Sequence, residues 1–259
     1  MSEVKRLVTL LGIDMRLVLR DSLLRWMVVL PLAIFAVMAW GLPLLSRLVM
    51  ETYQVDLSVY NPLIAVLVLG ILPGSYGFLL GFLLLDERDQ HTREALLITP
   101  LHPATFLLAR MGYTVLLSTL VGALLVRALG LLSLSWTPLL ACSFSAALLG
   151  PLMALALAAL AGDKVQGFAL YKALSGAQMP LMLAYFIDPP LQLAFGVLPN
   201  FWSAKMLWTL EAAAQGQPVA GAAVPSTAVV PTGWIYFAIS LLVQAALIVW
   251  LARRWARRP

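Results

Sequence analysis

The amino-acid sequence predicts an all-α, polytopic membrane protein with six transmembrane helices. The chain of 259 residues is 62% hydrophobic and only 11% charged, whereas soluble domains contain about 25% charged residues. Its apolar stretches run for about 20 residues, the length that a helix needs to cross a hydrocarbon core about 30 Å thick. In lipid the backbone must satisfy its own hydrogen bonds, so we expect helices rather than strands. The predicted spans cover residues 26–46, 62–85, 105–126, 138–161, 168–187 and 233–251.

These spans and their short connections leave little room for a folded soluble domain, so we expect one membrane domain over 1–259. Residues 1–25 precede the spans at 26–251, and 252–259 form a basic tail. In the first segment, apolar residues recur at helical spacing opposite basic ones, which predicts an amphipathic helix at the membrane interface. This helix is either an anchor for the first span or a lever that also touches a cytoplasmic partner.

Basic residues gather on one side of the predicted membrane. Of the 17 Lys and Arg residues, only Arg47, Arg127 and Lys205 fall on the other side. The positive-inside rule therefore places both termini in the cytoplasm. The charges are scattered along the membrane edges rather than collected on one face, which favours contact with membrane lipids and argues against nucleic acid as a partner.

The sequence lacks the motifs of an enzyme. It contains no G-x-x-x-x-G-K-[ST] loop, so we expect no ATP bound by this chain itself. His91 and His102 share one loop and Cys142 is the only cysteine, so no catalytic residue, metal site or bound cofactor is predicted. The span centres also lack the ionisable residues that ion-coupled transporters need at depth. We therefore expect a transport subunit that is powered from outside.

Small and polar residues within the spans suggest a translocation path. Glycines at spacings of three and four in the second span let another helix approach closely, either within the bundle or between subunits. Gln178 and Gln244 are the strongly polar residues at depth, and each suits either an interhelical hydrogen bond or a contact with cargo. The candidate path comprises Gly70, Gly74, Gly77 and Gln178.

The longest segment on the outer side covers 188–232. Its apolar stretch at 191–198 is too short to cross a membrane, and residues 200–214 carry Trp202 and Trp208. This pattern predicts a half-helix that dips into the membrane, followed by an interfacial helix with aromatic anchors.

The loop between the second and third spans begins with Asp86, Glu87, Arg88 and Asp89. A short helical pattern follows and stops at the prolines of 100–103. A short helix parallel to the membrane is suited to a groove on a soluble partner, and a solvated loop is the alternative.

The run Thr92-Arg93-Glu94-Ala95-Leu96-Leu97-Ile98-Thr99-Pro100-Leu101 resembles the loop of bacterial type-2 ABC exporter permeases. In that family an acidic residue, Gly-Thr, a second acidic residue, a Leu pair and Thr-Pro follow the second span. The sequence is most similar to the fluoroquinolone-export subgroup, which also fits the acidic start of the loop and the run 163–169 with Lys172. His91 stands where glycine is usual, and Arg93 where leucine is usual.

The resemblance implies a permease subunit of an ATP-driven multidrug-efflux system in the bacterial cytoplasmic (inner) membrane. It would form the path for a hydrophobic or amphipathic substrate such as a drug or lipid. The implied partners are two cytoplasmic ABC ATPase subunits, which bind ATP and Mg, and a second permease protomer in a homodimer or heterodimer. The resemblance also implies a partly re-entrant segment after the fifth span.

The resemblance further makes the loop a coupling helix seated in the ATPase. Its implied ATPase-coupling residues are Asp86, Glu87, Arg88, Asp89, His91, Thr92, Glu94, Leu96, Leu97, Thr99, Pro100 and Leu101.

Two other classes of function remain open at this point. An ion-coupled secondary transporter or channel would carry cargo along an ion gradient without any ATPase. A membrane-embedded enzyme or scaffold would need a polar constellation that faces a cavity.

Overall fold

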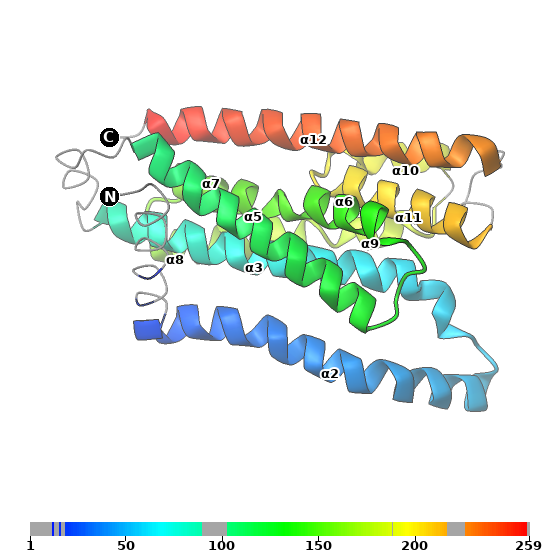
Figure 1. The fold of residues 1–259 in the computed structure, drawn as a ribbon. Helices are drawn as coiled ribbons and strands as arrows, with labels where there is room; N and C mark the ends of the chain where they lie inside the picture. Colours follow the sequence, from blue (N-terminus) through cyan, green and yellow to red (C-terminus); the bar gives the residue numbers. More distant parts are fainter. Residues whose placement is uncertain are drawn as a thin grey trace.

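The protein is all-helical in the part of the chain that the computed structural model describes, which is 12, 16, 19–89, 103–187, 189–216 and 226–257. No strand occurs in these ranges, so the predicted fold class is confirmed. The long helices lie along one axis, and the start of α2 and the end of α12 lie at the same end of the body (Figure 1).

Five candidate spans are long and apolar enough to cross a membrane, one of them formed by α6 and α7 together. They correspond to five of the predicted spans. Their helices are α2 (Ser22–Tyr53), α3 (Asn61–Asp89), α5 (Pro103–Ala128), α6 (Trp136–Ala147), α7 (Leu149–Leu160) and α12 (Ser226–Ala256).

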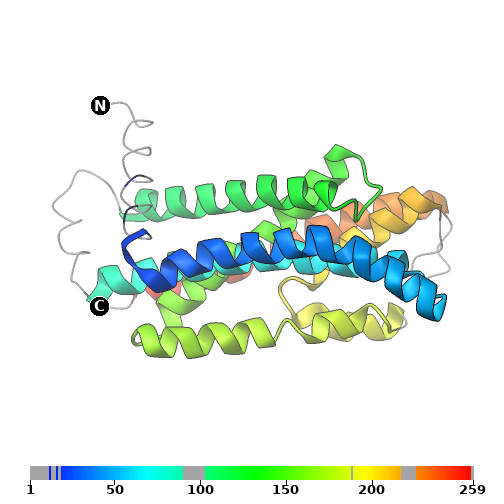
Figure 2. The ribbon, with the colours of Figure 1, turned by 90° about the horizontal axis from the view of Figure 1, so that it is seen from below.

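The remaining predicted span, 168–187, is not one continuous helix, so the count of six is not confirmed. The structure divides it into α8 (Lys164–Gly176) and the short α9 (Pro180–Ala184). Pro180 has no N–H to continue the helical hydrogen bonds, and its ring opposes the preceding turn. Between the two helices the backbone forms hydrogen bonds that span three residues instead of four, such as that from Gln178 N to the Ser175 carbonyl oxygen at 3.1 Å. In Figure 2 the two helices still follow one another along the side of the body.

The loop between the first two spans is shorter than the 47–61 that the predicted span limits leave for it, because α2 continues to Tyr53. Gln54 then ends the helix with a φ of 55°, in the left-handed region. Asp56 caps the short η1 (Leu57–Tyr60) by accepting a hydrogen bond from Ser58 N. The side-chain and backbone hydrogen bonds from Ser58 lower the pKa of the Asp56 carboxyl.

After α9 the chain turns back toward the body, and the partly re-entrant segment that the resemblance implies remains a prediction. The chain passes through α10 (Pro189–Gln192) and η2 (Leu193–Val197), and then α11 (Phe201–Gln215) begins. Figure 2 shows this return toward the middle of the bundle. Asn200 lies opposite Gly70, so it sits about 14 Å along α3 from Asn61 at ~1.5 Å per residue.

The prediction that 200–214 forms an interfacial helix is wrong. Phe201, Met206 and Trp208 are buried, and α11 packs against α6 and α12. Ser203, Lys205 and Thr209 form hydrogen bonds inside the body, which helps to enclose a helix with this composition. Trp208 Nε1 and Glu211 Oε2 have no hydrogen-bond partner among the described residues. The aromatic residues that suggested an interface instead contribute to the apolar core.

A buried polar cluster joins α11 to α6 and α12. The hydroxyls of Ser145, Ser203 and Ser240 form a triangle with sides of 2.7, 2.8 and 2.9 Å. Gln244 Nε2 donates to the Ser145 carbonyl oxygen at 2.9 Å and to Ser240 Oγ at 2.8 Å. Gln244 therefore makes an interhelical hydrogen bond.

The tightest helix crossing lies between α3 and α7. A Cβ added at Gly77 would overlap the carbonyl oxygen of Gly150 and lie 2.9 Å from Met153 Cβ. A Cβ added at Gly81 would lie 3.0 Å from Leu157 Cβ. Van der Waals packing between small residues is a main source of helix association in lipid, so this crossing fixes α3 in the bundle.

We predict that Gly77→Ala destabilises the protein by about 2 kcal/mol, because the added methyl group meets backbone rather than a movable side chain. The measurement is the midpoint of thermal unfolding in detergent. Gly112→Ala on α5 is the matched control, since nothing lies within 4 Å of a Cβ at that position. Equal midpoints for the two variants would contradict the proposed crossing.

Candidate functional site

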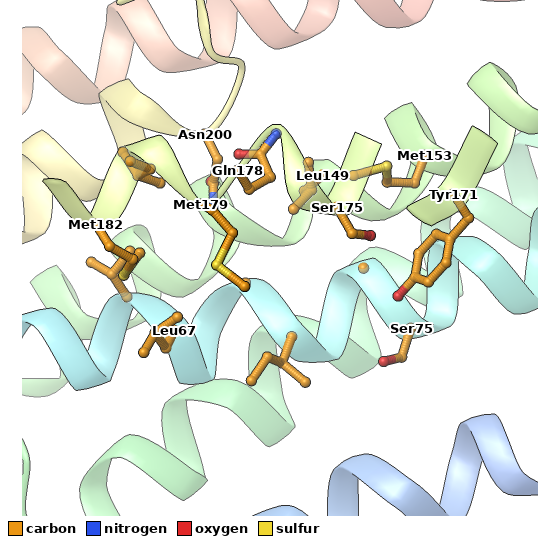
Figure 3. A pocket seen from close by; sticks show the side chains of 15 residues that line it. Leu67, Ser75, Leu149, Met153, Tyr171, Ser175, Gln178, Met179, Met182 and Asn200 are labelled. Atoms are coloured by element: carbon orange, nitrogen blue, oxygen red, sulfur yellow. The ribbon is translucent and has the colours of Figure 1, made fainter. Parts of the chain in front are cut away.

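A cavity of about 290 Å³ lies between α3, α7 and the broken segment formed by α8 and α9 (Figure 3). Three of the four residues predicted for the path line it, namely Gly70, Gly74 and Gln178. The remaining lining residues are Val66, Leu67, Ile71, Ser75, Leu149, Met153, Tyr171, Ser175, Met179, Leu181, Met182 and Asn200.

Two glycines leave room for the cavity on the α3 side. A Cβ at Gly70 would lie 3.6 Å from Asn200 Nδ2, and one at Gly74 would lie 3.9 Å from Tyr171 Oη. Any longer side chain would project into the space that the cavity occupies. Gly77, the fourth predicted path residue, lies instead at the crossing with α7 and is not among the lining residues. Its role in a path remains a prediction.

The cavity wall is mainly apolar and carries a few polar groups. Hydroxyls come from Ser75, Tyr171 and Ser175, and amides from Gln178 and Asn200. None of the described lining residues is acidic, basic or histidine. An apolar cavity with a few placed polar groups is the usual form of a small-molecule site.

Asn200 is a lining residue that the sequence analysis did not select. It precedes α11 at the N-cap position, where asparagine normally bonds a backbone N–H of the first turn. Here the side chain makes no capping hydrogen bond. The residue is only 4% exposed, and its Oδ1 accepts no hydrogen bond from any described residue. In the sequence, an asparagine after Pro199 is indistinguishable from an ordinary helix cap.

Gln178 owes its place to the break between α8 and α9. It lies in the turn that precedes Pro180, after the end of α8 at Gly176. Its Oε1 is buried and has no hydrogen-bond partner among the described residues. Figure 3 shows the amides of Gln178 and Asn200 together with Met179 among the lining side chains. The interhelical bond that Gln244 makes is therefore absent for Gln178 within the described chain.

The charged end of α3 is fixed to α5. Arg110 Nη1 donates to Glu87 Oε1 at 2.6 Å. The Arg110 side chain is only 3% exposed and that of Glu87 is 19% exposed, so the pair is shielded from water. A guanidinium at this depth depends on a nearby carboxylate, because desolvating a charge is costly.

Two further residues of this end hold the turn between α7 and α8. Arg88 Nη1 donates to the Ala161 carbonyl oxygen at 3.1 Å, and its Nη2 donates to that of Gly162. Lys164 Nζ lies 2.6 Å from Asp86 Oδ1 in a partly exposed ion pair. The last turn of α3 is thereby tied to three other helices.

The turn that receives Arg88 is itself a capping arrangement. Asp163 Oδ1 accepts a hydrogen bond from Gln166 N at 2.8 Å, and Gln166 Oε1 accepts one from Gly162 N at 2.9 Å. The first bond is the N-cap bond of α8, and the second returns to the residue before the cap, so the two bonds fix the turn with part of the run 163–169 that carried the family resemblance. Lys172 lies over the Phe168 ring at 4.8 Å from its centroid.

Most of the predicted coupling loop lies outside the described residues. This applies to His91, Thr92, Glu94, Leu96, Leu97, Thr99, Pro100 and Leu101. Asp89 ends α3, and Asp86, Glu87 and Arg88 make the contacts given above. The amphipathic helix predicted over 1–25 also falls mostly outside the described part. The coupling role of all these residues remains a prediction.

A family model described as "Fluoroquinolones export permease protein Rv2686c-like" matches residues 14–252. This chain belongs to that family. Two relatives from Mycobacterium tuberculosis, the fluoroquinolones export permease proteins Rv2686c and MT2760, are each 32% identical over 231 residues. The alignment covers 86% of this chain and 89% of each relative. No solved structure matches the chain significantly.

Family membership confirms the resemblance to fluoroquinolone-export permeases and, with the apolar helices, a membrane location. The matched range includes every residue that lines the cavity and both ion pairs at the end of α3. Both features therefore lie in the part of this export permease that the family shares.

We predict that Glu87→Gln destabilises this export permease by ~3 kcal/mol, because it removes a carboxylate charge beside the buried Arg110 guanidinium. Lys164→Gln is the control: it breaks an ion pair in which both side chains are partly exposed, which costs less than about 1 kcal/mol. Both are measured by thermal unfolding in lipid nanodiscs. Loss of the same size in both variants would argue against a structural role for the Glu87–Arg110 pair.

Proposed function

We propose that this permease is the membrane subunit of an ATP-driven (ABC) exporter, and that it moves an amphipathic, drug-like molecule through the cavity beside α3. The observation that carries the proposal is the cavity itself, whose lining in the described part of the chain consists of apolar side chains and a few neutral polar groups. The printed names of the relatives support a drug of the fluoroquinolone class as cargo.

The proposed energy source is a pair of separate cytoplasmic ATPase subunits that bind ATP and Mg. The sequence contains no P-loop, and no described lining residue of the cavity is an acidic, basic or histidine side chain through which an ion gradient could act. This chain itself is proposed to bind no cofactor and to catalyse no reaction.

α3 is the proposed mechanical link between the ATPase and the cargo. Its end adjoins the loop 90–102, and its middle supplies Gly70 and Gly74 to the cavity. Glu87 and Gly74 are separated by about 20 Å at ~1.5 Å per residue. Because Glu87 is paired with Arg110 on α5, a push on the loop would move the two helices together. The residues of 86–101 given above are the proposed ATPase contacts.

The proposed assembly is a dimer of permeases in the bacterial inner membrane with both termini in the cytoplasm. The common end of α2 and α12 supports termini on one side (Figure 1), and the distribution of basic residues supports the cytoplasmic side. Trp26, Trp40 and other large apolar residues leave much of α2 exposed. In a membrane such a surface is covered by lipid or by a second protomer.

One observation favours the ion-coupled transporter as a second candidate. Lys205 and Glu211 of α11 are 4% and 1% exposed, although the sequence analysis had placed them at the membrane interface. Lys205 Nζ donates to Gln192 Oε1. Ser133 donates to Glu211 Oε1 through both its N and its Oγ at 2.8 Å. Neither residue lines the cavity, so we favour ATP as the driving force.

The energy source is tested by reconstituting the permease in vesicles with an ATPase subunit encoded beside it. We expect fluoroquinolone transport that requires ATP and persists when ion gradients are collapsed. We also expect Glu94→Lys to reduce ATPase stimulation at least about tenfold, because a reversed charge opposes docking. Arg257→Gln at the same end of the body is the control. Transport by the permease alone, driven by an ion gradient, would refute the proposal.

The path is tested by blocking the cavity. We predict that Gly70→Leu lowers ATP-dependent fluoroquinolone export by about tenfold or more, since its side chain would overpack the cavity. Gly112→Leu is the matched control on the exposed face of α5, and it should export at the rate of the unmodified protein. Equal export by the two variants would remove the cavity from the path.

A further inference from the structure

We propose that Asn200 and Gln178 form the polar end of the cargo site, and that Met153, Met179 and Met182 hold an aromatic ring beside it. The ligand class is an aromatic amphiphile that presents an uncharged hydrogen-bonding group to the two amides. This inference rests on the proposed export function and names the residues that give it specificity.

The side chain of Asn200 has no role in holding the fold together within the described chain. It occupies a capping position without making the capping bond, and its buried Oδ1 has no partner. Burying a polar atom without a hydrogen bond destabilises the folded protein. Among the buried polar atoms that have no partner within the described chain, those of Asn200 and Gln178 belong to residues that line the cavity, where a ligand can supply the missing bond.

The position of Asn200 directs its amide toward the cavity. Its Nδ2 lies opposite Gly70, where a Cβ would be 3.6 Å away. The amide nitrogen therefore faces a gap in the α3 wall at a point where the residue is otherwise enclosed. The segment that returns from α9 carries this amide to a depth at which lipid offers it no alternative partner.

Gln178 supplies the second amide from a different element. Its buried Oε1 also has no partner among the described residues. The Gln178 amide and the Asn200 amide can each donate and accept, so together they suit a neutral group that does both. An ionised group at this end would be desolvated without a counter-charge, because no described lining residue is acidic or basic.

The methionines define the apolar part of the ligand. Met153 lies on α7, Met179 in the turn after α8, and Met182 on α9. Thioethers are flexible and polarisable, and they make favourable contacts with aromatic rings. The cavity of about 290 Å³ is close to the lower end of the ~300–1,000 Å³ usual for small-molecule sites. A lipid acyl chain would use the same apolar wall but would leave both amides unpaired.

The test is the binding of a fluoroquinolone to the purified permease in lipid nanodiscs, followed by the anisotropy of the drug's own fluorescence. Asn200→Leu keeps the side-chain size and removes the amide. We expect its affinity to fall about tenfold, the effect of losing a buried hydrogen bond. We also expect its unfolding temperature to stay the same or rise, because no hydrogen bond inside the protein is lost.

Gln244→Leu is the matched control for a structural amide. It removes the bonds to Ser145 and Ser240, so it should lower the unfolding temperature and leave fluoroquinolone affinity unchanged. Gln178→Leu is a second test variant on a different element, and it should reproduce the affinity loss of Asn200→Leu.

The proposal is overturned if wild type and both test variants bind equally, or if wild type shows no saturable binding, as for a cavity filled by lipid only. It is also overturned if Asn200→Leu unfolds as early as Gln244→Leu and binds normally. Neither the ATPase nor nucleotide is present in this experiment. Failure of the ATP-driven export proposal is therefore recognised separately, in the vesicle assay.

Discussion

The close crossing of α3 and α7 is the contact on which the rest of this permease depends. Lipid gives helices no hydrophobic reason to associate, so van der Waals contact between small residues must hold them. Gly77 and Gly150 bring the two backbones together at the middle of the body. With α3 held there, one of its ends is available to pair with α5 and α8, and its other half forms a wall of the cavity. A single helix thus provides the packing contact and, in the proposed mechanism, also the coupling end and the wall that cargo would meet.

The cavity exists because two segments beside α3 depart from regular helix. The break before Pro180 separates α8 from α9. The segment that returns from α9 ends at Asn200, the residue before α11. Each departure leaves an amide without a hydrogen-bond partner among the described residues. Irregular backbone at membrane depth is tolerated where it is enclosed by protein or lines a cavity. The cost of these orphaned groups is understandable if cargo satisfies them during transport.

Charged side chains have different kinds of partner at the end of α3 and in α11. At the end of α3 they form ion pairs that join this helix to α5 and α8. In α11 the buried Lys205 and Glu211 hydrogen-bond to Gln192, Ser133 and Gln215. Those contacts fasten the segment that returns from α9 to its surroundings. The bundle therefore keeps its charges away from the cavity, whose described lining is neutral.

The sequence by itself determined the fold class, five of the spans and the family, because length, apolarity and a loop motif are local properties of a chain. It also selected Gly70, Gly74 and Gln178, which line the cavity. Only the tertiary structure separated these glycines from Gly77, since spacings of three and four both keep a residue near the same helix face and do not tell which neighbour that face meets. It also decided the burial of α11 and the exposure of Asn200 to the cavity. Both depend on contacts between segments distant in sequence, and such contacts leave no periodicity to detect.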